Sequence, residues 1–199
     1  MFKRVDANID LPSVESEISA YWDKINAFET SVENRKNDKT FRFYDGPPFP
    51  TGSPHYGNLL AGVIKDIVPR YWTMRGYYVE RRFGWDVHGL PIEMEVQKKL
   101  NLEDPQQIDE YGIDKFNEAC RSQVQTNTEN WEKITRKIGR WVDFENDYKT
   151  MDIEFMESVW WVFKELWSKD LIYQDYKVLP YSWAASTPLS NFCLLYTSD

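Results

Sequence analysis

The stretch from Phe43 to Asn58 combines residue types that could bind phosphate. It reads FYDGPPFPTGSPHYGN, in which a short apolar run stops at Asp45, a loop rich in proline and glycine follows, and a helical pattern begins near His55. Proteins of the α/β class bind phosphate with this order of strand, loop and helix, because a helix N-terminus offers unpaired N–H groups and partial positive charge. We expect His55 and Asn58 in the first turn, each able to donate to a phosphate oxygen, with room for a ligand beside Gly57. Taken alone, the motif favours a proline-rich connector that carries an incidental histidine, and only the two stretches described next reverse that preference.

A second stretch, from Phe83 to Glu93, places a carboxylate where α/β folds bind substrates. It reads FGWDVHGLPIE and follows an apolar run that predicts a strand. Ligands bind at the carboxyl ends of the strands in parallel sheets. Asp86 could therefore offer its carboxylate to the ammonium group of an amino acid, or it could cap the loop. His88 could line the same site or orient Asp86.

Together with the run KVLPYSWAASTPLSNF from Lys177 to Phe192, these stretches resemble the isoleucyl-tRNA synthetases, which are class I aminoacyl-tRNA ligases. HYGN at positions 55–58 stands where that class carries its HIGH signature, and GWDVHGLPIE resembles the isoleucine member of the class. Asn58 replaces the last histidine of the signature, which keeps a hydrogen-bond donor and loses a titratable ring. The resemblance runs from about residue 6 to residue 192, whereas the tail 193–199 departs from the pattern and looks like read-through of non-coding sequence.

The resemblance implies an activity and a set of site residues. ATP and L-isoleucine would form isoleucyl-adenylate, and the isoleucyl group would pass to tRNA(Ile). The residues implied in catalysis are His55 and Asn58. Those implied in ATP binding are Pro48, Gly52, His55, Gly57 and Asn58. Those implied in isoleucine binding are Gly46, Pro47, Asp86 and His88. Mg²⁺ would enter with ATP, tRNA would be bound mainly by parts absent from this chain, and the enzyme would be cytoplasmic.

The fold class implied is α/β, with the first half of a parallel-sheet, Rossmann-like nucleotide-binding domain and an N-terminal helical extension. Residues 1–40 would form the extension, and residues 41–192 the half-domain. An editing insertion would begin near Asn191, and residues 193–199 would be a tail of doubtful origin.

Apolar spacing predicts the helices that would position the site. They cover residues 13–28, 55–74, 91–100, 113–138 and 153–169. Ser13 and Asp152 are the expected N-caps of the first and last helices. Pro69 should kink or break the second helix, and Gly76 should end it. The last helix is apolar on more than one face, which predicts that it lies between two layers.

Strands are predicted over residues 41–45, 77–83 and 172–181, and the first two should be parallel because a helix connects them. Residues 143–147, which read DFEND, are predicted to form an acidic loop. Cys120 lies on the apolar stripe of the long helix and is expected to be a buried small residue and not a nucleophile.

Composition limits the function classes. A hydrophobic content of 42% and an aromatic content of 16% argue against disorder, and no apolar run is long enough to cross a membrane. The net charge of −8 argues against a dedicated nucleic-acid platform, although residues 60–82 carry five basic and two acidic side chains. With two cysteines and no C-x-x-C, the sequence indicates a reducing compartment and no zinc site of that type. The carboxylates and the two histidines show no metal-ligand spacing, so no metal site is predicted.

Two other functions remain open. One is another nucleotidyltransferase of the same class, against which the stretch 84–93 argues. The other is a non-catalytic truncated product or binding module, which the lack of the second signature loop and of the rest of the sheet favours. An isoleucine-dependent ATP–pyrophosphate exchange assay separates these readings.

Overall fold

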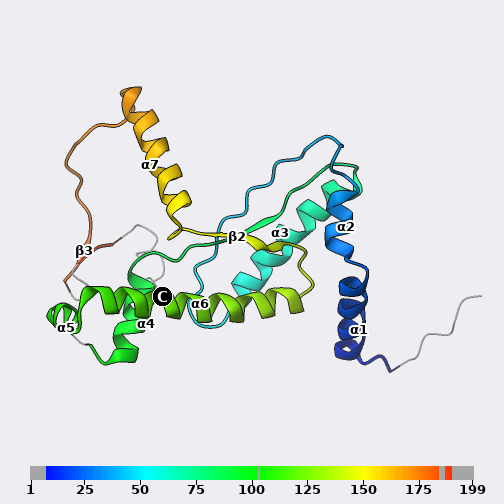
Figure 1. The fold of residues 1–199 in the computed structure, drawn as a ribbon, viewed down its shortest axis with the longest axis horizontal. Helices are drawn as coiled ribbons and strands as arrows, with labels where there is room; N and C mark the ends of the chain where they lie inside the picture. Colours follow the sequence, from blue (N-terminus) through cyan, green and yellow to red (C-terminus); the bar gives the residue numbers. More distant parts are fainter. Residues whose placement is uncertain (1–7, 103, 184–186, 190–199) are drawn as a thin grey trace, which may run out of the picture. The chain divides into compact units, whose positions relative to one another are not determined.

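The computed structural model describes residues 8–102, 104–183 and 187–189, and it forms two compact units, Met1–Met156 and Glu157–Asp199 (Figure 1). The insertion boundary expected near Asn191 and the tail 193–199 lie outside the described residues.

The segment before residue 40 contains two helices where the sequence predicts one. α1 covers Leu11–Lys24 and α2 covers Ala27–Glu33. The break occurs at Asn26, whose φ of 46° is left-handed and cannot continue a right-handed helix. The prediction of Ser13 as N-cap is wrong, because the helix begins earlier, with Asp10 at the N-cap position and Pro12 in the first turn.

α3 covers Tyr56–Met74 and carries the predicted phosphate-binding motif at its start. The helix continues through Pro69, so the break expected there does not occur. Arg81 donates hydrogen bonds to the carbonyl oxygen of Pro69 and to Oγ1 of Thr73, which stabilises the helix on the far side of the proline. Gly76, at φ 89°, follows the helix as predicted.

A two-stranded parallel sheet lies at the centre of the first unit. β1 (Arg82–Trp85) pairs with β2 (Asp143–Lys149), and a bulge lies between the Arg82–Asp143 and Gly84–Tyr148 pairs. The crossover between the strands contains α4 (Leu90–Leu100), α5 (Pro105–Tyr111) and α6 (Ile113–Lys137). α4 and α6 confirm the predicted helices, while the sequence patterns used here did not indicate α5.

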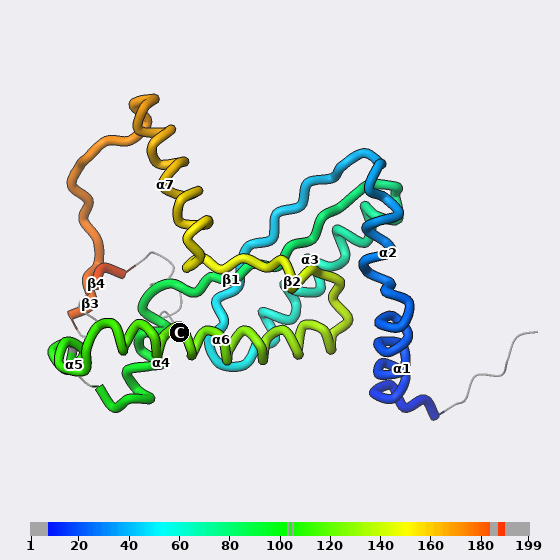
Figure 2. Tube along the Cα trace, in the orientation of Figure 1, coloured from blue at the N-terminus to red at the C-terminus, as the bar shows by residue number. Residues whose placement is uncertain are grey.

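Three strand predictions in the first unit need correction. The strand predicted over residues 77–83 begins only at Arg82, as β1, and Tyr78 takes part in an isolated bridge. The acidic stretch 143–147 belongs to β2 and is not a loop, because its exposed side chains point to solvent while Phe144 is buried. Residues 41–45 form no strand among the described residues. Only a single parallel bridge joins Thr40 to Tyr78, with the N–H of Phe41 donating to Tyr78 at 2.9 Å. Figure 2 follows this extended segment from α2 through the proline-rich loop into α3.

The core of the first unit lies between the sheet and the helices α4 and α6. The rings of Phe83 and Phe144, from neighbouring strands, stack at 4.6 Å between centroids, and Trp85 lies 4.5 Å from Phe83. The other buried members come from the loop after β1, from α4 and α6 of the crossover, and from the segment before β2: Val87, Ile92, Val96, Phe116, Val124, Trp131 and Val142. Cys120 packs against this core, as its place on the apolar stripe predicts, but it is partly and not fully buried. The side-chain packing of the crossover thereby supports the carboxyl end of β1.

The C-terminal elements differ from their predictions. α7 covers Ile153–Ser168, and no side chain of this helix is buried among the described residues, so the predicted layers on both sides are not found. The segment 172–180 forms no strand, and a short antiparallel pair follows, β3 (Tyr181–Ser182) with β4 (Thr187–Pro188). Asp152 precedes α7, and its carboxylate accepts the N–H of Lys149 at 2.7 Å. In the part of the chain that the structure describes, no helix is long and apolar enough to cross a bilayer.

Candidate functional site

A reciprocal cap joins His55 to Asn58 at the start of α3. Nδ1 of His55 accepts the N–H of Gly57 at 3.1 Å and that of Asn58 at 3.4 Å, and Oδ1 of Asn58 accepts the N–H of His55 at 3.0 Å. The structure thus places His55 at the N-cap position and Asn58 in the first turn, whereas the sequence predicts both in the first turn. The cap satisfies donors that a helix N-terminus otherwise leaves unpaired.

The cap decides which atoms of the two side chains remain available to a ligand. A ring nitrogen that accepts N–H groups carries no proton, so the neutral imidazole of His55 holds its proton on Nε2. The amide of Asn58 uses its oxygen in the cap, which leaves its NH₂ group to donate. Both residues therefore present a donor beside the helix N-terminus, as their predicted role requires.

Gly57 has a steric role that the sequence analysis did not anticipate. A Cβ at this position would lie 2.9 Å from Cε1 and 3.1 Å from Nδ1 of His55. Any side chain larger than hydrogen would push the imidazole out of the cap. The room at Gly57 is thus occupied by the ring of His55, and the glycine serves the cap directly.

The loop before α3 lines a cavity of about 230 Å³ that faces the start of the helix. Its lining includes Gly46, Pro47 and Pro48 from the loop, Asn58 from the first turn of α3, and Trp131 of α6. The indole N–H of Trp131 donates to the carbonyl oxygen of Gly52 at 2.9 Å, which attaches the glycine-containing turn to α6. Four predicted site residues therefore border one cavity, and a fifth, Gly52, is fixed beside it.

Asp86 follows β1 and connects the second predicted stretch to the first. Its N–H donates to the carbonyl oxygen of Pro48 at 2.9 Å, so residues far apart in the sequence meet at the carboxyl end of the strand. Asp86 is half-buried, whereas His88 is exposed. No hydrogen bond joins the His88 ring to Asp86 within the described ranges, so the geometry does not support the idea that His88 orients Asp86.

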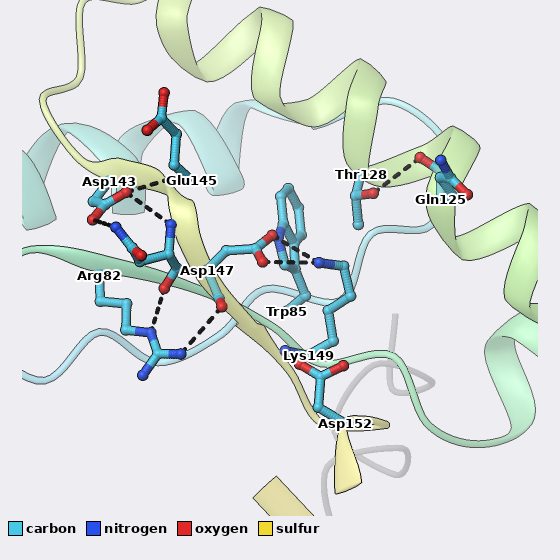
Figure 3. Close-up of polar contacts among 10 residues, drawn as sticks. Arg82, Trp85, Gln125, Thr128, Asp143, Glu145, Asp147, Lys149 and Asp152 are labelled. Carbon is cyan, nitrogen blue, oxygen red and sulfur yellow. Dashed lines mark hydrogen bonds and ion pairs between the residues drawn. The ribbon is translucent and has the colours of Figure 1, made fainter. Parts of the chain in front are cut away.

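Polar side-chain contacts of Arg82, Trp85, Asp147 and Lys149, which we call the clasp, join β1 to β2 and hold the strand that leads to Asp86 (Figure 3). The buried indole of Trp85 donates to Oδ2 of Asp147 at 2.7 Å, and Nζ of Lys149 lies 2.9 Å from both carboxylate oxygens. On the other side of the strand, the guanidinium of Arg82 donates to the carbonyl oxygens of Asn146 and Asp147. The two Arg82 bonds satisfy backbone carbonyl groups in the bulged part of β2.

Tyr148 of β2 lies against Gly84 of β1. A Cβ on Gly84 would lie 2.2 Å from Cζ of the tyrosine ring, so only glycine fits opposite this side chain. Burial raises the pKa of the Tyr148 phenol, and the negative charges of Asp45 and Asp86 raise it further, while Arg82 opposes them. Tyr148 is thus electrostatically close to both predicted loops, although the sequence patterns did not indicate it.

Sequence reasoning also missed a buried ionic cluster beneath the proline-rich loop. The carboxylate of Asp45 contacts Lys65 of α3 and Arg140, which follows α6. Asp45 stands next to the predicted residue Gly46, but its two partners lie 20 and 95 positions further along the chain. No local pattern could have paired these charges.

Metal ligands do not gather anywhere in the described part of the chain. No group of three or more His, Cys, Asp and Glu side chains there could hold a metal ion. Any Mg²⁺ at this site would depend on the oxygens of a phosphate ligand, which is how the ion is commonly bound in nucleotide sites.

Known proteins resemble this chain in sequence and in fold. The family model described as tRNA synthetases class I (I, L, M and V) matches residues 17–198. The chain is 55% identical to the cytoplasmic isoleucine–tRNA ligase of Arabidopsis thaliana over 91% of its own length and 15% of the relative's. It is 54% identical to the isoleucine–tRNA ligases of Anaplasma marginale and Mycobacterium tuberculosis, over 96% of its length and 17% and 18% of theirs. The chain therefore spans less than a fifth of the length of these relatives.

A solved structure shares the fold. The LeuRS of Agrobacterium radiobacter K84, in a ternary complex with tRNA and LeuAMS, matches 92% of this chain and 21% of its own chain with a TM-score of 0.64 and 22% sequence identity. At that identity the match concerns the fold alone. It agrees with a helical α/β arrangement that contains a small parallel sheet.

Proposed function

The chain belongs to the family of class I tRNA synthetases (I, L, M and V), and from this premise we propose that it is part of an isoleucine–tRNA ligase. The observation that carries the proposal is 54–55% identity to isoleucine–tRNA ligases over 91–96% of the chain. The chain spans only 15–18% of the length of those relatives. We therefore propose the activity for the full-length protein, by which we mean the longest natural protein that contains these residues.

The proposed reaction has two steps. The carboxylate of L-isoleucine attacks the α-phosphorus of ATP, the bond to the β-phosphate oxygen breaks, and pyrophosphate leaves with its electron pair. The isoleucyl group of the resulting adenylate then passes to a terminal ribose hydroxyl of tRNA(Ile), which loses its proton, and AMP is released. Such reactions depend mainly on the positioning of the reactants and on stabilisation of the developing charge.

We assign the phosphate side of the site to the start of α3. The Nε2–H of His55 and the NH₂ of Asn58 would donate to phosphate oxygens as negative charge develops in the transition state. Pro48, Gly52 and Gly57 would shape the ATP site around them. The positive end of the α3 dipole lies at the same place and adds to the stabilisation.

We assign the amino-acid side to the proline-rich loop and the end of β1. Asp86 would bind the ammonium group of isoleucine, with Gly46 and Pro47 along the substrate and His88 at the rim. The hydrogen bond from Asp86 to Pro48 supports this assignment, because it brings the amino-acid loop next to a residue of the ATP site. The two substrates must meet in this way for an in-line attack.

Mg²⁺ fits this proposal only as a companion of ATP. The described residues offer no cluster of three ligands, and Mg²⁺ in nucleotide sites keeps several waters and binds substrate phosphates. When bound, the ion would neutralise charge on the phosphates. The chain's own contribution is the pair of donors at His55 and Asn58.

The domain assignment is part of the same proposal. Residues 41–192 would form the first half of a Rossmann-like catalytic domain, with residues 1–40 as a helical extension, an editing insertion from about Asn191 and residues 193–199 as a tail of doubtful origin. The parallel pairing of β1 with β2 across three helices supports the Rossmann-like assignment. tRNA(Ile) would be bound mainly by other parts of the full-length protein. We place that protein in the cytoplasm, because the similar ligase of Arabidopsis is named as cytoplasmic.

The proposal is tested by ATP–pyrophosphate exchange with the full-length protein. Isoleucine should support faster exchange than valine, leucine or methionine at equal concentrations, and His55→Ala should remove most of the signal. Exchange that is faster with another of the four amino acids would assign a different substrate. If a folded full-length protein shows no pyrophosphate exchange with any of the four amino acids, the ligase function is rejected.

A further inference from the structure

A buried carboxylate holds the peptide that leads into the amino-acid loop. The side chain of Asp45 is 5% exposed and lies between two cations. Nζ of Lys65 is 2.6 Å from Oδ1, and Nη2 of Arg140 contacts Oδ2. A carboxylate is costly to bury unless cations pair with it, so Lys65 and Arg140 stabilise this position of Asp45.

The surrounding fold fixes both cations. Nζ of Lys65 also donates to the carbonyl oxygen of Gly46 at 2.6 Å, so one side chain binds two successive residues of the loop. The side chain of Arg140 is 7% exposed, and its guanidinium lies 5.2 Å from the centroid of the Phe83 ring. α3 and the segment after α6 therefore hold the same peptide from two directions.

Two prolines connect this anchor to Asp86. The rings of Pro47 and Pro48 restrict φ to about −65°, which leaves the link from Gly46 little freedom. The carbonyl oxygen of Pro48 then accepts the N–H of Asp86 at 2.9 Å. A shift of Asp45 would consequently move the group to which the backbone of Asp86 is bonded.

We propose that Asp45 is a positioning residue for the amino-acid site, which it serves by fixing Asp86 through Pro47 and Pro48, with Lys65 and Arg140 as its partners. The inference rests on the proposed function, in which Asp86 binds the ammonium group of isoleucine. Asp45 would act through its two cations and the loop backbone and would not itself bind the substrate. Its charge keeps the loop in the geometry that the substrate requires.

The first test measures amide hydrogen exchange by NMR on the 199-residue chain. Asp45→Asn keeps the shape of the side chain and removes its charge. The substitution replaces the charged contacts of Asp45 with weaker neutral ones, so the loop that carries Pro48 should be held less tightly. The N–H of Asp86, which donates to Pro48, should then exchange about 10-fold faster, roughly the factor between a charged and a neutral hydrogen bond. If this exchange is unchanged in a folded variant, the positioning role is wrong. Should Asp45→Asn fail to fold, Lys65→Met, at a side chain 28% exposed, carries the same test and the same two outcomes.

Glu95→Ala is the matched control. It removes hydrogen bonds from Gln123 and Asn127 to the Glu95 carboxylate, which lie between α4 and α6. Exchange should rise at that contact and stay unchanged at Asp86. If Glu95→Ala accelerates Asp86 as much as Asp45→Asn does, the effect is a general loss of stability and the inference fails.

The second test measures the steady-state kinetics of ATP–pyrophosphate exchange by the full-length protein. Asp45→Asn should raise the KM for isoleucine about 10-fold while the KM for ATP is unchanged, because the lost geometry belongs to the amino-acid side. A purely structural role would lower the active fraction, and hence kcat, without moving either KM. An unchanged isoleucine KM in an active protein would overturn the inference. If the unaltered full-length protein shows no isoleucine-dependent ATP–pyrophosphate exchange, the proposed function fails. The amide hydrogen exchange result still decides whether Asp45 positions Asp86.

Discussion

His55 and Asn58 cap each other: the imidazole Nδ1 accepts the backbone N–H of Asn58, and Oδ1 of Asn58 accepts the backbone N–H of His55 at 3.0 Å. The same two residues are the proposed phosphate donors. In each side chain one polar atom caps the helix, Nδ1 in His55 and Oδ1 in Asn58, and the other nitrogen can bind the substrate. Substitutions can separate these two functions.

His55→Ala should lose both functions, and His55→Asn only one. Loss of an N-cap costs about 1 kcal/mol, so the alanine variant should unfold at a lower urea concentration. Asparagine is itself a good N-cap but does not place a donor where Nε2 lies. Both variants should form adenylate about 10²- to 10³-fold more slowly in single-turnover measurements on the full-length protein, with little change in isoleucine binding. A parental rate in His55→Asn would show that His55 acts only as a cap.

Asp86→Ala should weaken isoleucine binding more than ATP binding. Removing a hydrogen bond to a charged group costs about 1.5–3 kcal/mol, which is roughly 10- to 150-fold in affinity. Apparent affinities for both substrates can be obtained from pyrophosphate exchange. Glu93→Ala, at an exposed acid in the first turn of α4, is the control and should change neither affinity. Equal losses for isoleucine and ATP would reject Asp86 as the ammonium ligand.

Gly84→Ala should destabilise the chain by about 1–3 kcal/mol, the usual cost of overpacking. The added methyl group would lie 2.2 Å from Cζ of Tyr148, within the ring that occupies this face of β1. Urea unfolding measures the change. In a Tyr148→Ala background the same substitution should cost much less, because the clashing atoms are gone. Equal costs in the two backgrounds would contradict the observed contact.

Cys120 should react slowly with thiol reagents. Burial raises the pKa of its thiol, and the negative charge of Glu93 raises it further, so less thiolate is present at a given pH. In a Cys193→Ser background, the rate with a disulfide reagent should be below that of a free cysteine at pH 8 and should rise in Glu93→Gln. Because the folded chain holds this proton more tightly than the unfolded chain, the stabilisation from the neutral thiol is present at lower pH and is lost as pH rises above the ordinary thiol pKa. Reaction as fast as free cysteine would contradict the burial.

The 199 residues alone should neither activate isoleucine nor charge tRNA. The ligases that the chain resembles are more than five times longer, and this chain supplies only one helix N-terminus and one amino-acid loop to the proposed site. Pyrophosphate exchange with the purified chain measures this, with His55→Ala as the background. Isoleucine-dependent exchange above that background would show that the residues present are sufficient.

The sequence by itself was enough to predict the helices that carry their own signals. α4 and α6 follow from apolar spacing and from a proline near the first turn of α4, and Gly76 ends α3 because a left-handed residue suits that position. The site motifs could likewise be recognised, since HYGN and GWDVHGLPIE are contiguous in the chain. These features depend on neighbours within a few positions, which is the range that sequence patterns cover.

Tertiary structure decided what depends on distant partners. The sequence predicts an acidic loop where β2 lies, because the strand character of this segment comes from pairing with β1 and from the clasp of Arg82, Asp147 and Trp85. The pairing of Asp45 with Arg140 and the bond from Asp86 to Pro48 likewise join residues that no local period relates. Burial lowers the local dielectric and makes an unpaired charge or amide costly, so the fold itself selects these partners.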